Sequence, residues 1–203
     1  MSSDHGVGRI EAFSDGVYAI AITLLILEIR VPEAEAIRAT GLWAALSAQW
    51  PSYGAFLLSF AVIGIMWANH HNIFRYIGKT NHLFLMLNLG LLLCTAFLPY
   101  PTAVLARFLR IPAERTAATV FYGATLTVTA IFYNGLWRYA ATGRWLLRAD
   151  ADQRHVDGVT REFRFGPALY LVATLVAFVN VWASLAIHAG LAALYVLPTP
   201  SRP

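Results

Sequence analysis

The chain has 203 residues, of which 58% are hydrophobic and only 13% are charged, against roughly 25% charged residues in an ordinary soluble domain. A water-soluble fold of this size could not bury that much apolar surface, so the composition excludes an ordinary soluble domain. The net charge of +4 comes from arginines that lie between apolar segments, which argues against a nucleic-acid partner. The single cysteine, Cys94, lies within an apolar segment, so an intrachain disulfide is excluded.

The apolar residues are grouped into segments of about twenty, the length of a helix that crosses a hydrocarbon core. Pro32 ends the first segment. The second can begin at Trp43 or at Trp50, since Pro51 is tolerated in a first helical turn. The sequence therefore predicts four long helices, over about residues 10–31, 43–69, 82–106 and 115–141.

The last third of the chain begins with its longest polar segment and then turns apolar. We expect a partly helical loop over residues 142–163. Residues 165–197 are apolar for 33 residues, with His188 as their one ionisable side chain. Because one straight span needs about 20 residues, this stretch predicts two short helices, about 164–182 and 184–198, folded back near Trp182.

Six spans place both termini on one side of the membrane, which allows the basic residues to be counted by side. Ten fall on the side of the termini and five on the other. Positive residues accumulate on the cytoplasmic side. The predicted fold is therefore an all-α, polytopic, single membrane domain (1–203) in the cell inner (plasma) membrane, with cytoplasmic N- and C-termini.

The first predicted helix carries a narrow apolar stripe and one acidic residue, Asp15, whose placement in a membrane is energetically costly. On pattern alone, such a stripe is ordinarily a contact with lipid or with another helix. Asp15 argues that this helix does more than contact lipid or another helix, because an acidic group at membrane depth usually marks function or a structural contact. Arg9 lies about 9 Å away along the helix, so a partner for Asp15 on another helix is an equal alternative. At 100° per residue the stripe comprises Phe13, Gly16, Ile20, Leu24, Leu27 and Val31, with Thr23 on its shoulder.

Arg9, Phe13, Ser14 and Asp15 match an Arg-x-x-x-Phe-Ser-Asp signature. With them, the chain resembles the transmembrane protein 175 family of potassium channels, whose first helix opens on that signature. The layout is also similar, with six spans and a basic third loop. A tryptophan and neighbouring polar residues close the second helix, as in that family: Trp67, Asn69, His70 and His71.

The resemblance implies a homotetramer in which the first helix of each subunit lines a central pore for potassium and other monovalent cations. It makes Ile20, Leu24 and Leu27 the apolar constriction and Thr23 a pore-facing hydroxyl. It implies no carbonyl-lined selectivity filter, and the sequence has no Thr-Val-Gly-Tyr-Gly loop. No cofactor, no metal site and no enzymatic activity are expected.

The resemblance also gives the signature a structural part. We expect polar contacts that tie the pore helix to its neighbours, with His70, His71 and His82 as candidate partners. The residues of this expected signature network are Arg9, Phe13, Ser14, Asp15, His70 and His71.

Two other functions remain as alternatives. His70 and His71 suggest a metal site, and with it a secondary transporter of a divalent metal or another cation. However, adjacent helical residues diverge by about 100°, so the two side chains cannot easily bind one ion together. An intramembrane enzyme is the weaker alternative, because the sequence has neither a His-Glu-x-x-His nor a Gly-x-Ser-x-Gly motif.

Several further polar residues lie near or within the apolar segments. Glu28, Glu33 and Glu35 lie at the predicted outer mouth, where they could concentrate cations or belong to an ordinary solvated loop. Asn88 and Asn134 lie deep in the third and fourth helices, a position typical of interhelical hydrogen bonds.

Overall fold

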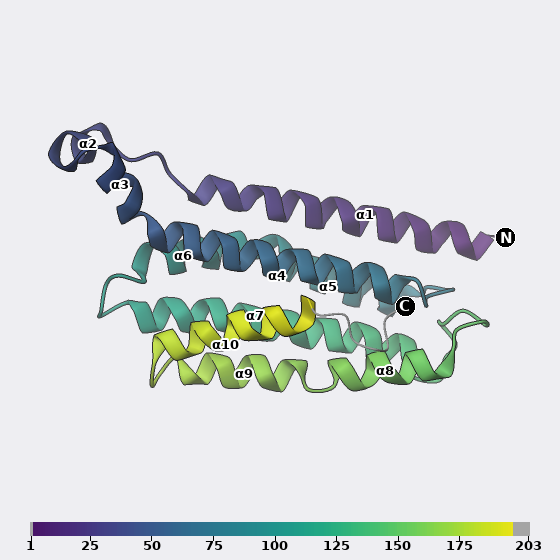
Figure 1. The fold of residues 1–203 in the computed structure, drawn as a ribbon. Coiled ribbons are helices and arrows are strands. Elements are labelled where there is room, and N and C mark those ends of the chain that lie inside the picture. The colour runs from purple at the N-terminus through teal and green to yellow at the C-terminus, as the bar shows by residue number, and fades with distance from the viewer. Residues whose placement is uncertain (1, 197–203) are drawn as a thin grey trace.

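The structure is a computed structural model that describes residues 2–196. Over these residues it is a bundle of α-helices whose long members run side by side (Figure 1). The predicted all-α class is confirmed, and the described residues add only one isolated β-bridge, between Ile77 and Leu147. The predicted end of the last helix, residues 197–198, lies outside the described residues.

The first helix is longer than predicted at its start. Helix α1 (Ser2–Leu24) begins about eight residues before the expected position and tightens into the 3₁₀-helix η1 (Leu25–Glu28). Hydropathy marks where a helix becomes apolar and not where it begins, so the polar first turns were missed. The backbone of Ile29 is extended, and Pro32 disfavours helix in the residue before it.

Two short helices, α2 (Ala34–Thr40) and α3 (Leu42–Ala48), extend beside the bundle at one of its ends, called here the α3 end (Figure 1). They meet at Gly41, whose φ of +82° is a conformation that glycine adopts most readily. The helix predicted from residue 43 divides further on, at Gln49, the residue between α3 and α4. Its long part, α4 (Trp50–Phe74), begins at Trp50 and runs five residues past the predicted end.

The third predicted helix is two helices in the structure. Helix α5 (His82–Phe97) ends at Leu98, and α6 (Pro99–Phe108) starts with a proline, which has no backbone N–H to continue the hydrogen-bond ladder. Helix α7 (Arg115–Ala141) occupies the predicted range 115–141.

The last part of the chain forms three helices. The expected loop contains the amphipathic helix α8 (Gln153–Phe163), at what we call the α8 end of the bundle. Helix α9 (Gly166–Val176) follows it, and α10 (Val181–Val196) folds back along α9 (Figure 1). The turn comes a few residues before the predicted 182–184, because the Asn180 side chain accepts hydrogen bonds from the backbone N–H groups of Trp182 and Ala183 and so starts α10 there.

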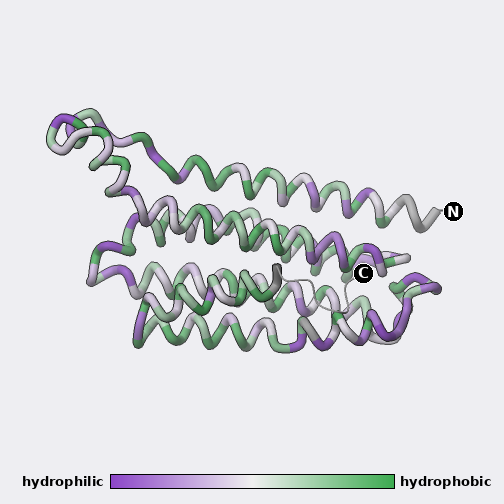
Figure 2. The backbone as a smooth tube through the Cα atoms, in the orientation of Figure 1, coloured by the Kyte–Doolittle hydropathy of each residue, from purple (hydrophilic) through white to green (hydrophobic). Residues whose placement is uncertain are grey.

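Within residues 2–196, four helical stretches are long and apolar enough to cross a membrane: Gly6–Glu28, Trp50–Phe74, His82–Phe108 and Arg115–Ala141. Figure 2 shows their hydrophobic middle parts and the more hydrophilic segments at the bundle ends. Helices α9 and α10 have 11 and 16 residues, so they are about 16 and 24 Å long.

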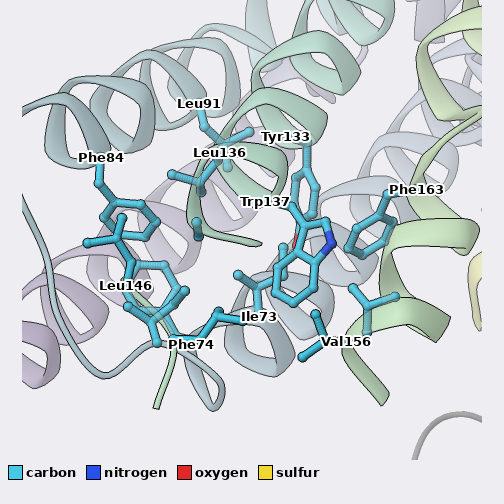
Figure 3. Packing of buried hydrophobic residues seen from close by; sticks show 14 of the residues in the cluster. Ile73, Phe74, Phe84, Leu91, Tyr133, Leu136, Trp137, Leu146, Val156 and Phe163 are labelled. Carbon is cyan, nitrogen blue, oxygen red and sulfur yellow. The ribbon is translucent and has the colours of Figure 1, made fainter. Parts of the chain in front are cut away.

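Two clusters of buried side chains hold the helices together. One lies toward the α8 end and centres on Trp137, Phe74 and Phe84 (Figure 3). The other lies toward the α3 end and includes Tyr122 and Ile63. The interior is packed tightly enough that a methyl group on Gly90 would lie 2.3 Å from the ring of Phe132, so a larger residue at Gly90 requires the ring to move.

Candidate functional site

Helix α1 lies along one edge of the bundle (Figure 1) and has two different faces. Tyr18, which is 2% exposed, and Leu25, which is fully buried, pack against the rest of the subunit. Ile20 is 62% exposed and Leu27 is 68% exposed, although both are large aliphatic residues. The subunit therefore leaves the apolar stripe of its first helix uncovered. The large stripe residues within α1 and η1 are exposed: Phe13, Ile20, Leu24 and Leu27. Val31 is also exposed, but the helix ends at Glu28 and not at the predicted residue 31, so Val31 lies outside it.

Thr23 lies beside this uncovered stripe and is itself exposed. Its hydroxyl lies 2.9 Å from the backbone carbonyl oxygens of Ala19 and of Ile20 in the same helix, and it donates its hydrogen to these two oxygens. A hydroxyl oxygen keeps two acceptor lone pairs when its hydrogen is donated. Thr23 can therefore offer an oxygen to a cation on the exposed side.

On the opposite face, Ser14 begins a buried hydrogen-bond chain across three helices. Ser14 donates to the Ile10 carbonyl at 2.8 Å, so its oxygen accepts from the Asn88 amide nitrogen at 3.0 Å. The Asn88 Oδ1 atom then lies 2.9 Å from His70 Nε2. An amide oxygen only accepts, so His70 donates from Nε2. All three side chains are buried, and the chain joins α1 to α5 and α4.

Asp15 makes a separate contact with α4. Its carboxylate accepts a hydrogen bond from the indole nitrogen of Trp67 at 2.9 Å. The two residues border a groove of about 330 Å³ between α1 and α4, with Ile22 and Gly64 among its other walls. The partner of Asp15 is therefore on another helix, which was one of the two alternatives left by the sequence.

The remaining signature residues lie nearer the α8 end. His71 Nδ1 lies 2.9 Å from a carboxylate oxygen of Glu11, which forms a second direct polar contact between α1 and α4. Arg9 and Phe13 are exposed side chains of α1. His82 begins α5, and its side chain is exposed.

Among the predicted network residues, the structure brings Ser14 to His70 through Asn88, and it places Asp15 beside Trp67. Asn88 had been expected only to make an interhelical hydrogen bond, and Trp67 had been noted for its place in the layout. Glu11 had no assigned role. Its position in the sequence could have indicated a role, because Glu11 lies four residues before Asp15 and therefore on the same side of the helix.

The two adjacent histidines serve different surroundings. His70 is fully buried and stacks on Phe74, with ring centroids 4.3 Å apart, whereas His71 is exposed and faces Glu11. Over the residues that the structure describes, no group of three or more His, Cys, Asp or Glu side chains could hold a metal ion. The pair is thus arranged as two separate interhelical contacts.

A bundle of long apolar helices, with buried polar contacts inside and an uncovered apolar helix at its edge, defines a multi-pass membrane protein. Residues 9–99 match the family model described as "Endosomal/lysosomal potassium channel TMEM175". The chain is 50% identical over 190 residues to a potassium channel of Chamaesiphon minutus, and the match covers 94% of this chain and 93% of that protein. The chain belongs to the TMEM175 family.

Other relatives agree with this assignment. A potassium channel of Streptomyces collinus is 42% identical over 96% of this chain and 95% of its own length. The human protein named "Endosomal/lysosomal proton channel TMEM175" is 34% identical over 85% of this chain, a match that covers 35% of the human protein. These relatives are named as ion channels and not as enzymes, in agreement with the sequence prediction.

A solved structure shows the same fold. The crystal structure of a lysosomal potassium-selective channel TMEM175 homolog from Chamaesiphon minutus superposes with a TM-score of 0.87 at 45% identity. The superposition covers 95% of this chain and 97% of that chain. The helix arrangement described above is therefore the TMEM175 channel fold.

Proposed function

We propose that the protein is a potassium-permeable cation channel whose pore is lined by α1 from several copies of the chain. The observation that supports this proposal best is the uncovered stripe on α1, where Ile20 and Leu27 are exposed while Tyr18 on the opposite face is buried. A large aliphatic stripe needs a partner surface or lipid. The names of the bacterial relatives, potassium channels similar over almost their full length, favour a pore.

The proposed assembly is a homotetramer with the α1 helices around a central axis. Four copies of Ile20, Leu24 and Leu27 would then form an apolar constriction that stops conduction when it is dry. An ion that enters must shed or distort its hydration shell, and this costs less for potassium than for the smaller sodium ion. The Thr23 oxygens would compensate part of that loss, so selectivity needs no carbonyl filter.

The signature residues then hold the pore helix in position. Ser14 bonds to Asn88, Asp15 to Trp67 and Glu11 to His71, so α1 has polar contacts to α4 and α5 at successive levels. Interhelical hydrogen bonds stabilise helix packing within a bilayer. Arg9 and Phe13 complete the proposed signature network at the α8 end, where Phe13 faces the same side as the stripe.

We further propose six spans with cytoplasmic termini in the plasma membrane, with α9 and α10 as the two short ones. Trp50 and Trp182 stack with ring centroids 6.0 Å apart at the starts of α4 and α10, so these helices begin at one level. Tryptophan favours the membrane interface. The α8 end carries the larger number of arginines, which favours the cytoplasmic side for it.

A second function, divalent-metal or other cation transport through the histidine pair, finds less support, because His70 and His71 make separate contacts. The deciding experiment is flux in proteoliposomes under gradients of potassium, sodium and manganese. We expect rapid potassium flux and slower sodium flux. Manganese uptake without potassium flux would contradict the channel and favour the transporter.

A further inference from the structure

A second cavity lies away from α1, between α4 on one side and α7 and α9 on the other. Its volume is about 70 Å³, several times the roughly 10–15 Å³ that one water molecule needs. Most of its lining is apolar, with Met66, Leu126 and Pro167 from three helices. Tyr133 and Phe163, which also line it, pack edge to face with ring centroids 5.2 Å apart (Figure 3).

Helix α10 forms part of the border of the cavity. Helix α10 packs between α4 and α9 in the half of the bundle toward the α3 end, and Ala192, near its last described turn, lines the cavity. At 16 residues it is about 24 Å long, shorter than a hydrocarbon core of ~30 Å.

The cavity extends along helix α7. On α7 its lining runs from Leu126 to Asn134, which is about 12 Å of helix. Its side walls, such as Ile65 and Ala130, are only partly buried, so the cavity is open to the surface of the subunit. This shape and depth fit part of an acyl chain that enters from the leaflet at the α8 end.

Two arginines lie close in the sequence to the lining residues nearest the α8 end. Arg138 follows Asn134 by one helical turn on α7, and Arg164 precedes Pro167 by three residues at the start of α9; both side chains are exposed. The Arg164 guanidinium lies 5.5 Å from the centre of the Phe165 ring. Arginine at a membrane surface attracts anionic headgroups and binds phosphate through several donors.

We propose that this cavity is a binding site for an anionic phospholipid, with an acyl chain against Met66, Leu126 and Phe163 and the phosphate between Arg138 and Arg164. The site is remote from α1 and goes beyond the proposed channel function, so a lipid could occupy it in a protein that conducts no potassium. Binding there would fix α9 and the end of α10 relative to α4.

The test is native mass spectrometry of the full chain in detergent, titrated with dioleoylphosphatidylglycerol or with dioleoylphosphatidylcholine. We expect tighter binding of phosphatidylglycerol, and a loss of affinity of about fivefold for each arginine removed in R138Q/R164Q. Ala130→Phe, which fills the cavity, should remove binding of both lipids. The matched controls are Arg107→Gln near the opposite end of the bundle and Val172→Phe on the exposed side of α9, which should bind like the unaltered chain.

Three results would overturn the proposal. The first is unchanged phosphatidylglycerol binding in Ala130→Phe, checked as folded by circular dichroism. The second is an unchanged preference for phosphatidylglycerol over phosphatidylcholine in R138Q/R164Q, which leaves the core untouched. The third is binding only by a chain ended at Val196, because the occupant would then be the C-terminus of the chain itself.

Discussion

Asp15 of α1 accepts a hydrogen bond from the indole nitrogen of Trp67 at 2.9 Å, across the boundary between α1 and α4. The two residues are 52 positions apart in the sequence. Together they border the groove between the two helices. This contact makes the position of α1 depend on α4, which is relevant to any mechanism in which α1 lines the pore.

Asp15→Ala should lower the free energy of unfolding by about 1 kcal/mol, because the Trp67 N–H loses its acceptor in the bilayer. Asp15→Asn keeps an acceptor oxygen and should lower it less. Thermal unfolding in detergent measures both variants. In a Trp67→Phe background the donor is already absent, so Asp15→Ala should then have little effect. Equal destabilisation by Asp15→Ala with and without Trp67 would show that the contact contributes nothing.

Asn88→Leu should destabilise the fold more than Ser14→Ala. Asn88 makes two of the buried hydrogen bonds, to Ser14 and to His70, whereas Ser14→Ala removes only the Ser14 partner. Each buried polar group left without a partner costs about 1–3 kcal/mol. Chemical denaturation in detergent, followed by tryptophan fluorescence, ranks the two variants. The reverse order would mean that His70 is stabilised by its stack on Phe74 and not by Asn88.

Gly90→Ala should destabilise the bundle by about 1–3 kcal/mol, because the added methyl would lie 2.3 Å from the Phe132 ring and force it to move. Gly135→Ala is the matched control: it lies inside α7, and a methyl there would meet no atom within 4 Å. The control should be neutral or stabilising by about 0.5–1 kcal/mol. Thermal unfolding of the two variants checks the prediction, and Phe132→Leu should restore part of the loss in Gly90→Ala. Similar behaviour of the two glycines would contradict the close packing of α5 on α7.

Thr23→Ala should reduce the permeability of potassium relative to sodium several-fold, whereas Thr23→Ser should keep most of it. The hydroxyl of Thr23 is anchored to the carbonyls of Ala19 and Ile20, so its oxygen is held on the exposed side of α1. Reversal potentials in planar bilayers with potassium on one side and sodium on the other measure the ratio. If Thr23→Ala leaves the ratio unchanged, selectivity resides in the apolar residues alone.

The sequence predicted well what depends on local pattern. Helix α7 occupies the predicted range because its ends coincide with the change from apolar to polar residues. Helix α2 was missed, and α3 was predicted only as the start of the helix over 43–69, because seven residues are too few to give a clear period. The start of α1 was missed because its first residues are helical but polar, and the prediction followed the apolar residues.

In the candidate site, too, the features that depend on local sequence pattern could be predicted, and those that depend on helix packing could not. The stripe of Ile20, Leu24 and Leu27 follows from the helical period, and its exposure in the subunit agrees with a face directed at other copies. The partners of Ser14 and Asp15 could not be predicted, because they lie on α5 and α4 and depend on how those helices pack. Only the three-dimensional arrangement joins residues that are 52 and 74 positions apart.

In the proposed channel, the exposed stripe of α1 lines a potassium pore. The most direct test compares ionic currents of the unaltered protein and Ile20→Asn in planar bilayers, with Val172→Asn as a control that places the same polar group on the exposed side of α9. If α1 lines the pore, the unaltered chain carries a potassium current, and Val172→Asn carries the same current. Ile20→Asn carries a several-fold larger and less selective current, because the polar ring wets the constriction. The same current for Ile20→Asn and for the unaltered chain would contradict the proposed pore.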